Sequence, residues 1–146
     1  MDKFFYKKNG FTLTELLVVV AILALLVTIG VTNTNAARSK AKDSVIKTNL
    51  NSLRSGGELW ANANGTYAGF CADNNCDCAV CSTDWKNVCS AVKVQNGNQA
   101  VNCTFSVQND RWCASSQLVG SPDYYCVDSI NKAQTQAAAC SNGSCQ

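Results

Sequence analysis

The sequence predicts an α+β fold in which a long N-terminal helix packs on a small antiparallel sheet with disulfide-rich loops. No proline interrupts the chain from Phe11 to Ala63, which favours one long helix. Short segments of alternating polarity follow later in the chain, and all ten cysteines lie between Cys71 and Cys145. We therefore expect four segments. They are a leader at 1–10, a transmembrane helix at 11–37, its amphipathic half at 38–63, and a disulfide-rich β region at 64–146.

The first part of the expected helix is suited to a membrane. Leu16 to Ala37 are 22 residues without a charge, and at about 1.5 Å per residue they would span roughly 33 Å, close to the thickness of a hydrocarbon core. A basic leader with Lys3, Lys7 and Lys8 predicts that the N-terminus stays cytoplasmic and the later domain lies outside. A cleaved secretory signal is the alternative, but this apolar run is longer than the usual core of such a signal, and no clear cleavage site follows it.

Composition excludes several functional classes. The net charge of +2 is too small to indicate a specific nucleic-acid partner. Histidine is absent, and no signature of a catalytic serine or cysteine is found, so we expect neither an enzyme nor a cofactor.

The second half of the expected helix carries one apolar stripe. Its residues recur at spacings of four and three, which is the period of a helix face that covers a core. Two adjacent glycines in this region allow close approach of another backbone. The stripe consists of Ile46, Leu50, Leu53, Gly57 and Trp60.

Beyond a helix stop at Asn64-Gly65, we expect a cysteine-rich loop from 67 to 89 and then an antiparallel meander of three or four strands. Alternating side chains and turn residues predict the strands, and an Asn-Gly pair predicts a tight hairpin turn. Residues after Ser129 are expected to form an irregular tail. The expected strands are Ala91–Gln95, Gln99–Val107, Trp112–Leu118 and Tyr124–Asp128.

The cysteines indicate a disulfide framework. An even number of cysteines in an exported segment is typical of an oxidising compartment. Zinc is the alternative, because one Cys-x-x-Cys spacing is present, but a second such pair and histidine are both missing. The sequence leaves the pairing open among Cys71, Cys76, Cys78, Cys81, Cys89, Cys103, Cys113, Cys126, Cys140 and Cys145.

A calcium loop is a weaker alternative in the same region. Asp73, Asn75 and Asp77 follow the opening of such a loop, and Asp84 stands where a closing acid would be. Cys78 occupies the position of the usual turn glycine, and a solvated acidic loop explains the same residues. We therefore expect no metal here.

Glu15 is an acid at the mouth of an otherwise uncharged helix. A lone carboxylate at the centre of a bilayer costs roughly 2.5–3.5 kcal/mol, so a plain membrane anchor has no reason to carry one. It can be tolerated near the headgroups, where the N-terminus of a helix favours an acid. It can also be stabilised by a cation.

Residues 7–15, Lys-Lys-Asn-Gly-Phe-Thr-Leu-Thr-Glu, together with the apolar run after them, closely resemble the class III signal of type IV pilins and pseudopilins. This resemblance implies that a prepilin peptidase cuts between Gly10 and Phe11 and that Phe11 becomes N-methylated. It also implies that Glu15 pairs with the amino terminus of a neighbouring subunit. The sequence departs from the common pattern at Thr14 and lacks a proline in the helix.

The same resemblance implies a function as a structural subunit of a type IV pilus or a similar filament, in which the helix at 11–37 forms the filament core. Its expected partners are copies of itself and other pilins, the prepilin peptidase, a membrane assembly platform and, before assembly, membrane lipid. The expected location is the cytoplasmic membrane and then an extracellular pilus. A pseudopilin of a secretion or DNA-uptake apparatus, and an anchored disulfide-rich binding domain that never polymerises, remain alternatives.

Overall fold

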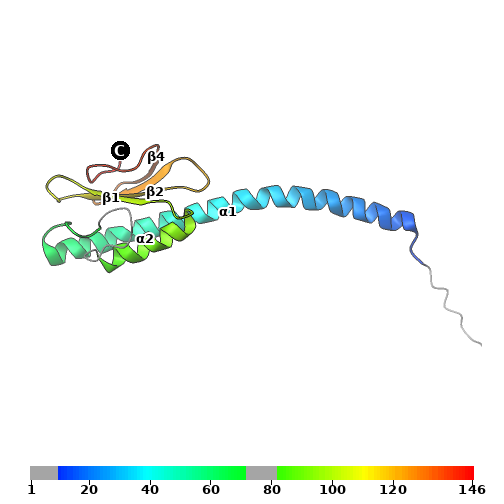
Figure 1. Ribbon diagram of the computed structural model, residues 1–146, viewed down its shortest axis with the longest axis horizontal. Coiled ribbons are helices and arrows are strands. Elements are labelled where there is room, and N and C mark those ends of the chain that lie inside the picture. Colours follow the sequence, from blue (N-terminus) through cyan, green and yellow to red (C-terminus); the bar gives the residue numbers. More distant parts are fainter. Residues whose placement is uncertain (1–9, 72–81) are drawn as a thin grey trace, which may run out of the picture. The chain divides into compact units, whose positions relative to one another are not determined.

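The computed structural model describes residues 10–71 and 82–146, without the side chains of residues 29–33. It divides into two compact units, Met1–Ala37 and Arg38–Gln146. Figure 1 shows the helices and a sheet whose strands follow one another in the order β1-β2-β3-β4, all antiparallel. The elements are α1 (Leu13–Asn64), α2 (Thr83–Gln95), β1 (Val101–Phe105), β2 (Trp112–Gln117), β3 (Tyr124–Asp128) and β4 (Ala133–Gln136).

The long helix is present as predicted, and the α+β class is confirmed. α1 ends at Asn64, and the next residue, Gly65, has a positive φ of 71° that closes the helix without strain. Among the described residues, no helix combines the length and the apolar character that crossing a membrane requires. The membrane-spanning helix expected at 11–37 is therefore not shown by the structure.

The sheet separates two groups of buried side chains in the second unit. On one face, Trp112, Ala114 and Val127 join residues of α1 and α2 in the main core. Phe70 packs against Trp112 there, with ring centroids 4.9 Å apart. Because side chains alternate along a strand, the intervening residues face the other way. They contribute to a second buried cluster, which consists of Cys113, Cys126, Cys140 and Cys145.

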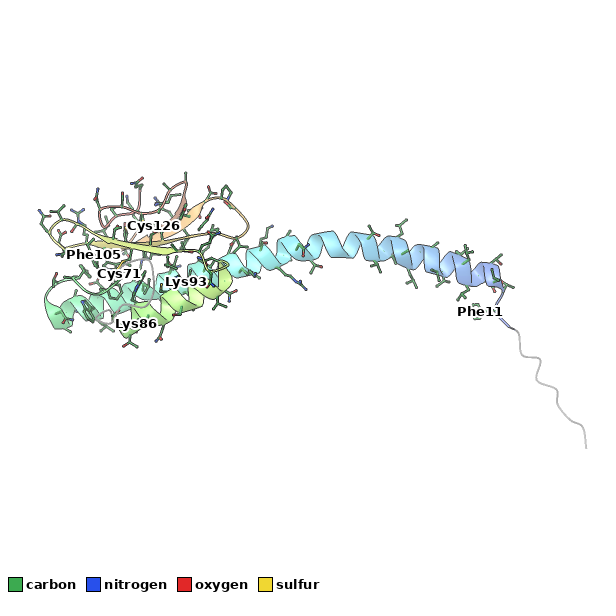
Figure 2. All side chains as sticks on the ribbon, viewed as in Figure 1. Phe11, Cys71, Lys86, Lys93, Phe105 and Cys126 are labelled. Atoms are coloured by element: carbon green, nitrogen blue, oxygen red, sulfur yellow. A yellow bond between two sulfur atoms is a disulfide. The ribbon has the colours of Figure 1, made fainter. Side chains whose placement is uncertain are left out.

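The expected strand at Ala91–Gln95 was wrong, because these residues lie in α2. The Ser82 hydroxyl accepts a hydrogen bond from the Trp85 backbone N–H at 3.1 Å and so caps the start of this helix. Trp85, Cys89 and Val92 are fully buried at spacings of four and three, which is a helical period. Lys86 lies on the side of α2 that points away from the sheet (Figure 2). The last part of the expected loop at 67–89 was therefore wrong, because residues 83–89 are helical, and the predicted hairpin turn at Asn96-Gly97 is the end of a helix.

Residues 133–136 were expected in an irregular tail but form β4. Their sequence, Ala-Gln-Thr-Gln, has a single small apolar side chain and no apolar alternation that would signal a buried strand. β4 forms by antiparallel pairing with β3, where Tyr125 lies opposite Thr135. The strands expected at 99–107 and 112–118 are present at slightly narrower bounds, and the strand expected at 124–128 has the predicted bounds.

Candidate functional site

The predicted cleavage point lies immediately before α1 and is open to solvent. Gly10 is exposed, and a Cβ atom added to it would meet no other atom within 4 Å. Phe11 is 86% exposed and lies at the start of the helix (Figure 2). The Gly10–Phe11 peptide bond is therefore accessible from the surrounding solution.

Thr12 and Glu15 form a reciprocal cap at the start of α1. The Glu15 Oε2 atom accepts hydrogen bonds from the Thr12 backbone N–H at 2.9 Å and from the Thr12 hydroxyl at 2.8 Å. In return, the Glu15 backbone N–H donates to the Thr12 hydroxyl oxygen at 3.3 Å. This is the capping-box arrangement, in which a threonine before the helix and a glutamate three residues later satisfy backbone groups that the helix leaves unpaired.

The cap gives Glu15 a local role in the single chain. Its carboxylate is exposed and is bound through one oxygen, Oε2, so the other oxygen keeps its capacity to accept. Glu15 was predicted from the sequence as a functional residue, whereas Thr12 was not. The spacing Thr-x-x-Glu directly before an apolar run is the signal that identifies such a cap.

The first turns of α1 after this cap expose apolar side chains. Leu16, Leu17, Leu25 and Val27 are each more than 60% exposed, and the neighbouring valines and leucines are about as open. A contiguous apolar surface of this kind on a folded protein indicates a region that another molecule covers. The region from Leu13 to Val27 is called the apolar segment below.

The stripe predicted on the second half of the helix faces the main core. Ile46, Leu50 and Leu53 are fully buried, and Trp60 is partly buried against the same cluster. Gly57 is buried beneath the indole ring of Trp112. The glycine thus admits a side chain of the sheet, and the expected approach of a backbone at this position was wrong.

Disulfides join the sheet to segments that would otherwise be loose. Cys71–Cys103 links the chain after α1 to β1, and Cys113–Cys140 links β2 to the C-terminal segment. Cys126–Cys145 links β3 to the same segment, 19 residues further along the chain. Cys89 is also disulfide-bonded. Cys76, Cys78 and Cys81 lie outside the described residues.

Three of the four residues of the weak calcium candidate lie outside the described residues, namely Asp73, Asn75 and Asp77. Asp84 is exposed in the first turn of α2, next to Gly56 of α1. Within residues 10–71 and 82–146, no group of three or more acidic or cysteine side chains is placed to hold a metal ion.

Comparison with known proteins agrees with the motif at the start of α1. The family model for the prokaryotic N-terminal methylation motif matches residues 6–31. The type IV wide pilus major component PilA4 of Thermus thermophilus is 41% identical over 59 residues, which are 40% of this chain and 45% of that protein. The chain therefore spans less than half the length of this curated relative. No solved structure matches the chain. The methylation motif and the identity to PilA4 support a type IV pilin family for this chain.

Proposed function

We propose that this chain, with the N-terminal motif of the type IV pilin family, is a structural subunit of a type IV pilus or a similar filament. The precursor is inserted in the membrane with the 38–146 region outside. A prepilin peptidase cuts it between Gly10 and Phe11, Phe11 is N-methylated, and a membrane assembly platform adds the mature subunit to the filament. Other pilins can join the same filament. No catalytic role is part of this proposal.

The exposed apolar segment is the main observation that supports this proposal. A helix that displays leucine and valine on all sides is not stable in water by itself, and lipid or other helices must cover it. In the membrane, lipid covers the apolar segment of the precursor. In the filament, the same segment of neighbouring copies covers it, so that leaving the bilayer does not transfer these side chains to water.

The pairing of Glu15 gives the filament its register. Cleavage before Phe11 creates a positively charged amino group, which lies in the same layer of the membrane as Glu15. A carboxylate buried among apolar helices needs such a cation, because an unpaired buried charge costs several kcal/mol. The carboxylate oxygen that does not cap Thr12 can accept from the amino terminus of a neighbouring subunit.

The disulfides support an extracellular location for the 64–146 region. Disulfides persist in oxidising compartments and are rare in the cytosol. A domain with three described disulfides, of which two fasten the C-terminal segment, is suited to the outside of the cell. It would form the outer surface of the filament.

Mass spectrometry of the protein recovered from its native host tests the processing. A chain that begins at methylated Phe11 supports the proposal. A chain that begins at Met1 would favour an anchored domain that does not polymerise, and one that begins near Arg38 would favour a cleaved secretory signal. Electron microscopy of the cell surface then distinguishes a pilin, which forms long fibres, from a pseudopilin, which does not.

A further inference from the structure

The second unit begins with an exposed cluster of positive charge on α1. Arg38, Lys40 and Lys42 are all exposed, and these three residues are called the basic collar below. Residues 38–47 carry four basic side chains and one acidic side chain, whereas residues 48–146 carry five basic and seven acidic ones. The positive charge of this unit is therefore concentrated where its chain begins.

The acid of this segment does not neutralise the collar. The Asp43 carboxylate accepts the backbone N–H groups of Val119 at 2.6 Å and of Gly120 at 3.2 Å, so the turn between β2 and β3 holds it. Over the part of the chain that the structure describes, the ion pair found joins Arg111 to Asp110. The three cations of the collar therefore remain available to an external anion.

The collar surrounds the helix within a thin layer. Arg38 and Lys42 are four residues apart and share one side of α1, whereas Lys40, two residues from each, lies on the opposite side. At about 1.5 Å per residue, the three positions occupy roughly 6 Å of the helix axis. A protein partner that lies along one side of α1 would contact only part of the collar. A layer of negative charge that crosses the helix axis would contact all of it.

The headgroup region of a lipid leaflet is such a layer. It is roughly 5–8 Å deep, which is half of the difference in thickness between the whole bilayer and its hydrocarbon core. Arg38 directly follows the uncharged run at 16–37, whose length is suited to that core. In a membrane-inserted precursor, the collar would therefore enter the headgroup region of the outer leaflet. Lysine and arginine are normally enriched on the cytoplasmic side of a membrane helix, so orientation does not explain their presence here.

We propose that the basic collar binds the headgroups of anionic phospholipids in the outer leaflet of the membrane before the subunit enters a filament. The proposal rests on the membrane insertion that is part of the proposed function. Long basic side chains at such a position place their stems along the helix and their charges among the lipid phosphates. The contact would hold the start of the second unit at the membrane surface, and it must be broken when the subunit leaves the bilayer.

Isothermal titration calorimetry tests the lipid preference with the full-length chain in micelles of an uncharged detergent. The titrants are phosphatidylglycerol, which is anionic, and phosphatidylcholine, which carries the same phosphate but no net charge. We expect phosphatidylglycerol to bind with the lower Kd and added salt to raise that Kd, because salt screens exposed charges. Equal Kd values for the two lipids would contradict the proposal.

Double variants identify the cations that bind. Arg38→Gln combined with Lys40→Gln should raise the Kd of phosphatidylglycerol at least about fivefold, which is the factor expected for one basic residue near an anionic surface. Glutamine suits an exposed helix position, so the fold should be kept. Arg111→Gln combined with Lys86→Gln removes the same charges outside the collar and should leave the Kd unchanged. An equal rise in both double variants would show that only net charge matters and would overturn the proposal.

Flotation with vesicles of phosphatidylcholine alone separates the collar from the proposed function, because insertion there depends on the apolar segment. Insertion into these vesicles, without any preference for phosphatidylglycerol in the titration, would overturn the collar proposal and leave the proposed function intact. Failure to insert would contradict both. A preference for phosphatidylglycerol in a chain that forms no filaments would contradict the proposed function alone.

Acidic side chains of a second copy are the competing partner of the collar. Sedimentation of the wild type and of the Arg38→Gln, Lys40→Gln variant in the same detergent measures self-association. Weaker self-association of the variant, together with an unchanged Kd for phosphatidylglycerol, would assign the collar to a contact between copies and overturn the lipid proposal. Unchanged self-association with a raised Kd is the result that we expect.

Discussion

The indole ring of Trp112 lies directly against Gly57 of α1, so that a Cβ atom at position 57 would stand 2.7 Å from the indole Nε1. Trp112 is fully buried and packs against the tilted ring of Phe70 in the main core. The absence of a side chain at Gly57 therefore sets how closely the sheet approaches the helix.

Gly57→Ala should lower the free energy of unfolding of the 38–146 region. Alanine in a helix gains about 1 kcal/mol over glycine, but the added methyl group would displace a rigid buried ring, and overpacking of this kind costs typically 1–3 kcal/mol. We expect a net loss, measured by urea denaturation with tryptophan fluorescence.

Gly56→Ala is the matched control for this prediction. Its Cβ atom would meet the side chain of Asp84, at 2.8 Å from Oδ2, and Asp84 is exposed and can turn away. Gly56→Ala should therefore cost less than Gly57→Ala or stabilise the protein. An equal loss for both variants would show that helix geometry, and not the indole ring, accounts for the effect.

Asp128→Asn should destabilise the C-terminal segment. The two carboxylate oxygens together accept three backbone N–H groups, and Oδ2 holds that of Cys145. An asparagine places an N–H₂ group at one of these positions, which leaves a buried donor without an acceptor at a cost of about 1–3 kcal/mol. Asp110→Asn is the control, because Asp110 is 55% exposed. Urea denaturation would measure both variants, and equal stability of the two would contradict the prediction.

Tyr67 should ionise at a higher pH than a free tyrosine side chain. Burial and, to a smaller extent, the hydrogen bond to Glu58 raise the pKa of Tyr67 from 10.0 to about 12. Because the folded protein holds this proton more tightly than the unfolded chain, the stabilising effect is complete below pH 10. It is lost as the pH rises from 10 towards about 12.

Tyr67→Phe should remove this contribution, so its stability should fall less than that of the wild type across the same pH interval. Ultraviolet titration of phenolate absorbance should lose its latest step in the variant. Glu58→Gln should move that step to lower pH without abolishing it, because burial remains. A wild-type phenolate titration that matches that of Tyr67→Phe between pH 10 and about 12 would contradict the raised pKa.

Two substitutions at the start of α1 separate capping from charge. Glu15→Gln keeps a side chain that can complete the capping box but removes the negative charge. Thr12→Ala removes the cap, at about 1 kcal/mol, and keeps the charge. If Glu15 pairs with the amino terminus of a neighbour, Glu15→Gln should abolish filaments and Thr12→Ala should retain them. Electron microscopy would show the filaments, and immunoblots of membranes would verify that both variants are inserted. The opposite pattern would assign Glu15 to capping alone.

Local sequence determined the parts of this protein that depend on neighbouring residues. The long helix, its stop before Gly65 and the motif around Gly10 and Glu15 were all predictable, because helical period, turn residues and charge placement act over a few positions. The alternation of Val101 to Phe105 similarly predicted a strand that is half buried. The abundance of cysteine indicated disulfides but could not indicate their partners.

The tertiary structure decided what depends on segments far apart in the chain. The polar segment β4 forms a strand because it pairs with the free edge of β3. The carboxylate of Asp43 in α1 accepts a hydrogen bond from the backbone N–H of Val119, 76 residues away, at 2.6 Å. The pairing of the described cysteines and the place of Gly57 beneath Trp112 follow from the same packing. Arg54 reads in the sequence as an ordinary surface residue of a helix. In the folded chain, its Nε and Nη2 atoms are buried without a hydrogen-bond partner, while the carboxylates of Glu58 and Asp128 accept hydrogen bonds from other groups. Burial and hydrogen bonding of this kind arise only when the helices and strands pack together.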